Sequence, residues 1–456
     1  MSRTLGKITN ETTATKTSKV ALGPLGAALF FVGNPILRLF TFPLFIIRLL
    51  FKGKKVAKFI GVGYPSIGLK EKEYILDTLK KNRLSYGAYT AEFEKKFAQH
   101  HQRKFAIFCN SGTSALQAGL HALKIKHNWK DNDEVIVPAL TFVASVNVIL
   151  QNRLKPVFVD VESNYYGIDP QKIEEKISKK TKAIMPVHLF GLPCDMNPII
   201  KIAKKYNLSV IEDSCETMFA RYRGNSVGSW GEVSCFSTYA AHLLVTGVGG
   251  FATTNDPDLA VIIKSLFNHG RDGIYTTLED TLLARGKPGQ LKQIVTRRFN
   301  FIYQGYSYRA TELEGAIGLA QIERWKEIIG GHQKNAVYLT YRLKAFSEYF
   351  QLPAVRPGAT HAFMMYPLVI KAPKKVDREQ LIMFLEKNMI ETRYLLPLLN
   401  QPVYTRLWGN LEKQYPVAKY IYNNGFYIGC HQDLTRSDLN YVVSKFEEYL
   451  KIHDLI

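Results

Sequence analysis

Apolar residues follow two alternating patterns from Tyr64 to the C-terminus. Short runs rich in β-branched and aromatic residues alternate with stretches in which apolar positions recur at helical spacing. The stretches 113–123 and 198–206 are predicted helices. Strands that are apolar on both faces and connected by helices indicate a mostly parallel α/β sheet. The runs predict strands at 104–109, 134–139, 155–161, 182–189, 208–213, 233–238 and 250–254.

The pattern changes after a helix predicted over 311–329. A strand at 366–370 and helices at 377–388 and 436–450 indicate a smaller α+β domain. The stretch 272–300 has weak periodicity and predicts an exposed insertion. We therefore expect three parts, which are an N-terminal arm at 1–60, a large domain at 64–325 and a small domain at 326–456.

The composition is that of a folded protein with an uneven basic charge. The chain is 46% hydrophobic and 22% charged, which excludes disorder and coiled coil. Its net charge is +21, and residues 1–60 hold ten Lys or Arg and one Glu. A basic excess suits anionic membranes, nucleic acids or phosphorylated ligands. We expect no nucleic-acid partner, because the excess lies beside an apolar segment and no recognition motif accompanies it.

Residues 21–51 are mostly apolar, but Arg38, Pro43 and Arg48 interrupt them. Charges at the centre of a bilayer are costly, so this pattern favours a membrane-surface or re-entrant anchor over residues 21–58. A true membrane span and an apolar arm packed on a partner subunit remain alternatives. The lysines that follow Phe51 predict that the body lies on the cytoplasmic side of the membrane.

The five cysteines are scattered along the chain without a CxxC pair. Their odd number and their spacing fit neither a disulfide framework nor a zinc site. We therefore expect a reducing compartment and no metal site.

Three features carry candidate chemistry. The run 110–114 (NSGTS) lies between a strand and a helix, where backbone N–H groups and the helix dipole favour a phosphate. Asp213 ends an apolar strand, the position at which open α/β sheets place ligand contacts, although it also suits an ordinary helix cap. Phe142 is a candidate for stacking on a planar ring, with a place in the core as the alternative.

Eight ordered blocks resemble the sugar-nucleotide aminotransferases of the DegT/StrS type, from Tyr64 to the C-terminus. The blocks are SGTSAL, PALTFVAS, VFVDV, VHLFG, IEDSCE, CFSTYAAH with GVGG, NHGRD and AIGLAQIERW. The resemblance implies a fold-type I enzyme that depends on pyridoxal phosphate (PLP), with a large and a small domain. It also implies a homodimer, because this family completes each site with a partner's residues.

The resemblance assigns roles by matching position. Gly112, Thr113 and Ser237 would bind the cofactor phosphate. Phe142 would stack on the pyridine ring, and Asp213 would pair with its protonated nitrogen, which keeps the ring an electron sink. Glu216 stands near the ring hydroxyl, where the family usually has Gln.

His242 occupies the position of the lysine that binds PLP covalently in this family. No lysine lies between Lys205 and Lys264 that could replace it. Imidazole cannot hold PLP covalently, but it acts as a general base near neutral pH. The resemblance therefore implies a cofactor bound non-covalently, most naturally as pyridoxamine phosphate (PMP).

A branch of the family with this histidine removes the C3 hydroxyl of 4-keto-6-deoxy nucleotide sugars. One subset of the branch carries an iron–sulfur cluster on cysteines just after the GRD motif. Here Gly270–Asp272 is followed by no cysteine before Cys430. We therefore expect no cluster, and glutamate as the amino donor that restores PMP. The hypothesis is a nucleotide-sugar dehydratase for glycolipid or polysaccharide synthesis.

Two further departures keep alternatives open. Val248 replaces the Glu of the family's GEGG loop, and Ser307 replaces the Asn of the GxNxR motif, whose side chain reaches a cofactor phosphate. Arg309 of that motif and His188 of VHLFG are candidate substrate-binding residues, although a structural role for His188 is equally open. An aminotransferase of the same family and an inactive membrane-tethered homologue are the alternative functions.

Overall fold

A seven-stranded sheet carries the largest of three hydrophobic cores on one face and the smallest, around Ile136, Ile184 and Val210, on the other. The computed structural model describes residues 58–272, 289, 292, 295–296 and 299–456. The predicted membrane arm, except for its last residues, and most of the predicted insertion at 272–300 lie outside the described residues.

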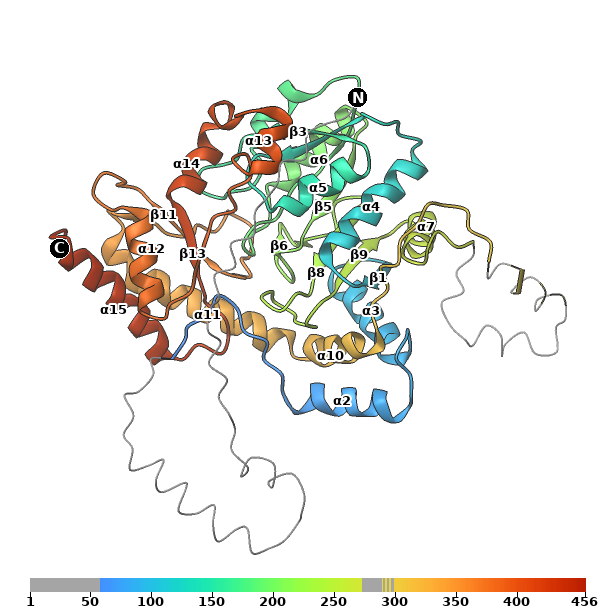
Figure 1. Cartoon of the computed structure of the whole chain (residues 1–456), viewed down its shortest axis with the longest axis horizontal. Coiled ribbons are helices and arrows are strands. Elements are labelled where there is room, and N and C mark those ends of the chain that lie inside the picture. Colours follow the sequence, from blue (N-terminus) through green and yellow to red (C-terminus); the bar gives the residue numbers. More distant parts are fainter. Residues whose placement is uncertain (1–57, 273–288, 290–291, 293–294, 297–298) are drawn as a thin grey trace, which may run out of the picture. The chain divides into compact units, whose positions relative to one another are not determined.

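The seven strands lie in the order β1-β9-β8-β5-β4-β2-β3 (Figure 1). Strand β9 is antiparallel to both of its neighbours, and the remaining pairs are parallel. This topology confirms the predicted mostly parallel α/β sheet. The strands are β1 (Phe105–Cys109), β2 (Glu134–Pro138), β3 (Lys155–Val159), β4 (Thr181–Ile184), β5 (Ser209–Asp213), β8 (Val233–Ser237) and β9 (Gly250–Thr254).

Helices connect these strands where the sequence shows helical periods. Ser111 caps α4, because its side chain accepts a hydrogen bond from the Ser114 N–H at 3.0 Å. Helix α6 buries one apolar stripe that includes Met196, Ile199 and Ile202. The helices around this sheet are α2 (Leu69–Lys80), α3 (Ala88–His100), α4 (Gly112–Lys126), α5 (Val143–Gln151), α6 (Met196–Lys205), α7 (Pro257–Phe267) and α10 (Glu312–Glu323).

Two elements differ from the predictions. Strand β4 ends at Ile184, five residues before the predicted end, and Pro186 close behind it has no N–H for a ladder. The helix predicted over 311–329 is broken at Arg324 into α10 and α11 (Trp325–Leu343). Neither Gly nor Pro marks this break, so the sequence pattern carried no signal for it.

A second, antiparallel sheet has the strand order β10-β11-β13-β12. Its core also contains residues of α11, α12 and α15, together with Ile60, which is 2% exposed. The bounds are β10 (Phe350–Gln351), β11 (Tyr366–Ile370), α12 (Arg378–Lys387), β12 (Thr392–Tyr394), α13 (Pro402–Trp408), α14 (Pro416–Asn424), β13 (Gly425–Ile428) and α15 (Arg436–Ile452).

The largest core, which we call the first, and the core of the antiparallel sheet, which we call the second, do not follow the predicted domain boundaries residue by residue. Ile60, placed at the end of the arm, packs in the second core, whereas Leu395, Tyr404 and Tyr422 belong to the first. Contacts of this kind join Lys58–Ile456 into one compact unit. The boundaries at 64, 325 and 326 therefore stay a prediction.

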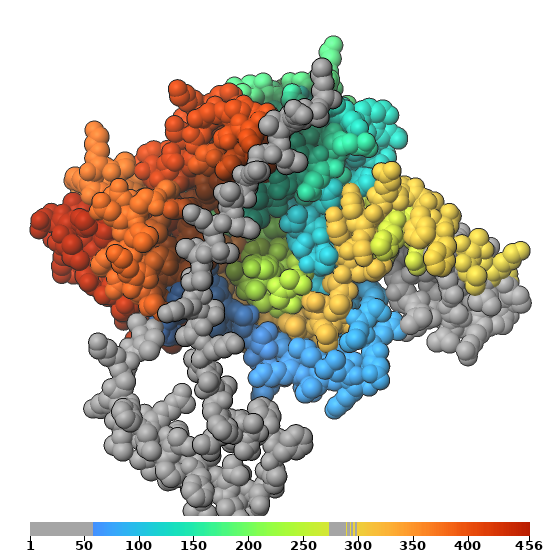
Figure 2. Space-filling model, in the orientation of Figure 1, coloured from blue at the N-terminus to red at the C-terminus, as the bar shows by residue number. Residues whose placement is uncertain are grey.

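Helix α2 forms a ridge at the surface of the described body, drawn in blue in Figure 2. It packs on α10, yet Leu69, Leu76 and Leu79 remain exposed. Within the part of the chain that the structure describes, we found no helix with the length and apolar character needed to cross a membrane.

Candidate active site

The predicted cofactor residues follow the ends of four strands of the large sheet. Gly112 comes after β1 and Phe142 after β2, while Asp213 and Ser237 end β5 and β8. Because β1, β2, β5 and β8 run in one direction, their carboxyl ends lie at the same edge of the sheet (Figure 1). This is the edge at which α/β sheets bind ligands.

Gly112 stands where the start of α4 meets the end of β8. A Cβ at Gly112 would lie 2.7 Å from the Cβ of Ser237 and 2.8 Å from the sulfur of Cys215. Only glycine fits this approach, which brings the helix N-terminus beside Ser237. Thr113, in the first turn, is exposed. The first backbone N–H groups of α4 therefore form a site suited to a phosphate.

Asp213 is buried and held by two neutral donors. Its Oδ2 accepts a hydrogen bond from Ser145 Oγ at 2.7 Å, and its Oδ1 accepts one from the Cys215 N–H at 3.1 Å. The Thr141 hydroxyl lies 2.7 Å from Ser145 Oγ and completes the chain. Burial raises the pKa of Asp213, with these hydrogen bonds opposing the rise. A cation placed beside this carboxylate would balance its charge.

The sequence interpretation did not single out Ser145 and Thr141. Both are polar residues inside the otherwise apolar stretch PALTFVAS, and they are four positions apart. Two polar residues inside an apolar stretch just after a strand were the signal available: Thr141 precedes the N-cap of α5, and Ser145 lies in its first turn.

Glu216 lies three residues after Asp213 and receives the Phe190 N–H at 3.0 Å on its Oε2. Burial raises the pKa of Glu216 to about 7. Phe190 has a φ of +59°, a strained conformation for a bulky residue, and the Glu216 hydrogen bond holds it. Glu216 therefore exchanges a proton near neutral pH, which a Gln at this position could not do.

Phe142 precedes the first residue of α5, and 57% of its surface is exposed. The core alternative for Phe142 does not fit this exposure. A phenyl ring this open, at the ligand-binding edge of the sheet, is available to stack on a planar ring.

His242 is half-buried in the loop that connects β8 with β9. Its Nδ1 donates a hydrogen bond to the Ser237 carbonyl at 3.3 Å, which leaves Nε2 as the basic nitrogen. The ring stands edge-on to Tyr239, with 5.9 Å between ring centroids. Burial lowers the pKa of His242 to about 4, against the opposing effect of the Ser237 and Cys215 backbone. The imidazole is therefore neutral at pH 7 and can accept a proton.

Ser307 and Arg309 lie on a separate exposed segment. Arg309 donates to Ser307 Oγ at 3.0 Å and to Asn268 Oδ1 at 3.4 Å. Between them, the Tyr308 carbonyl accepts the Asn110 N–H at 2.9 Å, so the segment lies beside the β1–α4 turn. No contact among the described residues joins the two side chains to Asp213 or His242.

His188 is fully buried, and both of its ring nitrogens have protein partners. Nε2 lies 3.0 Å from Glu212 Oε2, and Nδ1 accepts the Cys194 N–H at 3.0 Å. These contacts favour the structural alternative for His188 over direct contact with a substrate. The sequence interpretation missed its partner Glu212, because one acidic residue beside another gave no sign of facing the interior.

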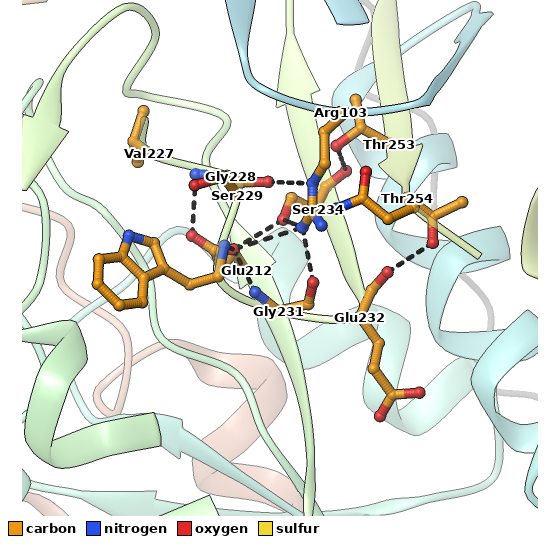
Figure 3. A network of polar contacts seen from close by, with 12 residues as sticks. Arg103, Glu212, Val227, Gly228, Ser229, Gly231, Glu232, Ser234, Thr253 and Thr254 are labelled. Carbon is orange, nitrogen blue, oxygen red and sulfur yellow. Dashed lines mark hydrogen bonds and ion pairs between the residues drawn. The ribbon is translucent and has the colours of Figure 1, made fainter. Parts of the chain in front are cut away.

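Glu212 is the centre of a buried polar network (Figure 3). It accepts hydrogen bonds from the N–H groups of Gly228, Trp230 and Gly231 and from the hydroxyl of Ser234. The Arg103 guanidinium, also buried, lies 3.7 Å from its Oε1. This network fixes the strand that carries Asp213.

The comparisons with known proteins show the family of the chain. The family model described as the DegT/DnrJ/EryC1/StrS aminotransferase family matches residues 65–447. The chain belongs to this family. One DegT/DnrJ/EryC1/StrS relative is the GDP-perosamine synthase of Caulobacter vibrioides, which is 34% identical over 393 residues, 86% of this chain and 98% of the relative.

Two further DegT/DnrJ/EryC1/StrS relatives are dehydratases. The dTDP-4-dehydro-2,6-dideoxy-D-glucose 3-dehydratase of Saccharopolyspora spinosa is 29% identical over 382 residues, with 81% of each chain covered. The E. coli GDP-4-keto-6-deoxy-D-mannose-3-dehydratase, solved with bound hydrated PLP, superposes with a TM-score of 0.74 at 25% identity. That alignment covers 85% of this chain and 98% of the dehydratase. The protein is thus an enzyme of the PLP-dependent sugar aminotransferase family.

The residues of this chain fit the family's cofactor. The close approach at Gly112 brings the N-terminus of α4 beside Ser237, Phe142 presents an exposed ring, and Asp213 is a buried carboxylate with only neutral donors. A phosphate, a planar ring and a protonated pyridine nitrogen complement these three features in turn.

The described residues contain no group of three or more His, Cys, Asp or Glu side chains arranged to hold a metal ion. The five cysteines are all free, and Cys215 is the most exposed of them. The expectation of no iron–sulfur cluster stays a prediction.

Proposed function

We propose that the protein is a PMP-dependent 3-dehydratase of a 4-keto-6-deoxy nucleotide sugar, with His242 as the catalytic base. The observation that carries the proposal is the half-buried His242 imidazole, held by the Ser237 carbonyl and lying five residues after Ser237, where the resemblance places the family's PLP-binding lysine. Two DegT/DnrJ/EryC1/StrS relatives that are 3-dehydratases support the same reaction.

The cofactor is held without a covalent bond by residues of the large sheet. Gly112, Thr113 and Ser237 bind its phosphate, and Phe142 stacks on its ring. Asp213 pairs with the ring nitrogen, and Glu216 lies by the ring hydroxyl. When bound, the cofactor supplies an amino group for the sugar ketone and a ring that takes up electrons.

His242 moves the proton in this proposal. Its Nε2 accepts the proton, while the Nδ1–H bond to the Ser237 carbonyl fixes the orientation of the ring. Because burial lowers the pKa of His242 to about 4, the base stays neutral at every pH well above that value. Protonation of this base should therefore lower the rate as the pH drops toward 4.

Glutamate supplies the electrons and protons that the proposed reaction needs. Loss of the C3 hydroxyl as water, with a hydrogen left at C3, requires two electrons and two protons. Oxidation of glutamate to 2-oxoglutarate and ammonia provides them. A dehydratase therefore forms one ammonia for each sugar, whereas an aminotransferase leaves that nitrogen on the sugar.

An aminotransferase is the second candidate, because the GDP-perosamine synthase of Caulobacter vibrioides is 34% identical. An inactive homologue is the third, because Val248 and Ser307 depart from the family's motifs. To separate the three, we would incubate the full chain with PMP, glutamate and GDP- or dTDP-linked 4-keto-6-deoxy sugars. Ammonia with a 3-deoxy product supports the dehydratase. An amino sugar without ammonia contradicts it, and so does the absence of any product.

His242→Asn tests the base directly. We expect the rate to fall about 10²- to 10⁴-fold, because the amide cannot accept the proton. The matched control is His127→Asn, a surface histidine that pairs with Glu232 at 2.8 Å, near the far end of α4. Equal activity of wild type and His242→Asn would contradict the proposed base.

The exposed motif with Ser307 and Arg309 leads us to propose a homodimer, in which these residues reach the cofactor phosphate and the substrate of the partner's site. Light scattering of the full chain would give twice the mass of the chain. A stable monomer with full activity would contradict the dimer.

We also propose that residues 21–58 hold the body on the cytoplasmic surface of a membrane. In a flotation experiment, the full chain should rise with anionic vesicles. Neutralising the lysines at 52, 54, 55 and 58 should weaken its binding to the vesicles. If the full chain stays with the soluble fraction, the anchor is wrong.

A further inference from the structure

Residues 58–66, which we call the strap, connect the N-terminal arm to α2 and are anchored at both ends. In Figure 1 they are the first part of the blue trace, which runs past the end of β13 toward α2. The N–H of Ile60 donates to the Met389 carbonyl at 2.8 Å, and the Glu391 N–H donates to the Ile60 carbonyl at 2.9 Å. The start of the strap therefore pairs with the chain just before β12.

Side chains strengthen this first anchor. Glu391 Oε2 accepts the Val62 N–H at 2.8 Å, and Lys58 forms an ion pair with Asp438 at 2.6 Å. A Cβ at Gly429, just after β13, would lie 3.1 Å from the Cα of Val62. The strap thus lies directly on the backbone that follows β13.

The second anchor is on α10. The Ser66 carbonyl accepts a hydrogen bond from Gln321 Nε2 at 2.9 Å and another from the Arg324 guanidinium. Gln321 also donates to the buried Glu71 at 2.6 Å. Between Ile60 and Ser66 the strap has little freedom to move, because each end is fixed to a packed element.

Between its anchors, the strap touches the loop that carries His242. A Cβ at Gly63 would lie 2.8 Å from the Cα, 3.0 Å from the carbonyl oxygen and 3.1 Å from the Cβ of Ala241. Ala241 immediately precedes His242, and the His242 N–H donates to the Tyr239 carbonyl at 2.9 Å in the same turn. The strap and the base loop are therefore in backbone contact.

We infer that Gly63 is a positioning residue for His242, which acts through the contact between the strap and Ala241. The inference rests on the proposed role of His242 as the base. A side chain at position 63 cannot be accommodated by the strap, which is anchored on both sides, so the loop at Ala241 gives way. The imidazole then leaves the place set by Ser237, Cys215 and Tyr239.

Gly63→Ala in the full chain tests this inference with two readouts. The first is the titration of the His242 imidazole, followed by NMR with labelled histidine and without substrate. Because burial holds the pKa of His242 low, displacement toward water should raise it by at least about one unit. The second is turnover, where a misplaced base should lower kcat at least about tenfold while KM changes little.

Gly330→Ala is the matched control, because a Cβ at Gly330 would meet nothing within 4 Å. It should leave both readouts unchanged. The double variant Gly63→Ala/Ala241→Gly removes one of the three close contacts and should recover part of the pKa change. A purely structural role would lower the melting temperature without moving the His242 titration.

If Gly63→Ala does not fold, Glu391→Ala replaces it, since this change loosens the first anchor without adding bulk. It should shift the His242 titration in the same direction by a smaller amount. An unchanged titration and kcat in a folded Gly63→Ala protein would overturn the inference. The NMR readout needs no substrate, so a failure of the proposed reaction would be seen separately, as wild type without turnover.

Discussion

Glu212 and Asp213 are consecutive carboxylates on β5, yet the structure uses them in opposite ways. Glu212 accepts four hydrogen bonds from backbone and serine donors, contacts His188 and lies beside the Arg103 charge. Asp213 accepts only two hydrogen bonds, both from neutral groups. Successive side chains of a strand point to opposite faces, so the two acids have separate surroundings.

Their pKa values differ accordingly. Burial alone would raise the pKa of Glu212, but the hydrogen bond from His188, the Arg103 charge and the Gly231 N–H hold it at about 2. Burial dominates at Asp213 and raises its pKa. The comparison teaches that pairing decides the pKa of a buried acid: several donors and a nearby cation lower it, whereas two neutral donors leave the effect of burial dominant.

Glu212→Gln should have the largest effect on stability. It leaves the buried Arg103 without its counter-charge and turns an amide toward N–H donors, at a cost of about 3–5 kcal/mol. Urea unfolding measures this loss. The neighbouring Glu232→Gln is the control, because Glu232 pairs with His127 at the surface and should cost about 1 kcal/mol at most. Equal losses of stability in Glu212→Gln and Glu232→Gln would contradict the structural role of the buried Glu212.

Asp213→Asn should lower the affinity for PMP and leave the stability of the fold unchanged or higher. Loss of a charged partner for the ring nitrogen should weaken PMP binding by about 1.5–3 kcal/mol, or roughly 10- to 150-fold. The free energy of unfolding without cofactor should not fall, because a buried charge with few partners is removed. Fluorescence or absorbance titration with PMP gives the affinity. Unchanged affinity would show that Asp213 does not contact the cofactor.

The two acids should also differ in their dependence on pH. The folded-state pKa of Glu212 lies below its ordinary 4.5, so its contribution to stability is complete above that pH and disappears as the pH falls toward 2. The pKa of Asp213 is raised, so its burial costs stability as the pH rises past its folded pKa. Urea unfolding from pH 2 to 6 should therefore show wild type and Glu212→Gln converging at low pH. A difference in unfolding free energy between the two proteins that stays constant from pH 2 to 6 would contradict this.

The smallest effects should come from the serines that serve each acid. Ser145→Ala removes one of only two donors to Asp213. It should weaken the free energy of PMP binding by about 0.5–1.5 kcal/mol, which is a several-fold loss of PMP affinity. Ser234→Ala removes one of several donors to Glu212 and should cost a similar amount of stability. It should leave PMP affinity unchanged. If both variants change only PMP affinity, or both change only the free energy of unfolding, the proposed difference between Asp213 and Glu212 is wrong.

The sequence predicted the sheet well because buried parallel strands are short apolar runs with clear ends. Strand ends, the turn NSGTS and the resemblance point to the same candidate cofactor residues, whose roles stay a prediction. It missed Ser145 and Thr141, whose partner lies far along the chain. It also missed the break at Arg324, where neither Gly nor Pro interrupts the helical pattern.

The sequence by itself determined the α/β sheet, the family motifs and the absence of any lysine between Lys205 and Lys264, since each depends on residue type and order. The tertiary structure alone decided which side of β5 each acid faces, that His188 is buried, and that Gly63 touches Ala241. Those facts depend on contacts between segments that are distant in the chain. Packing, rather than local pattern, sets such contacts, because a side chain's surroundings come from whichever elements the fold brings together.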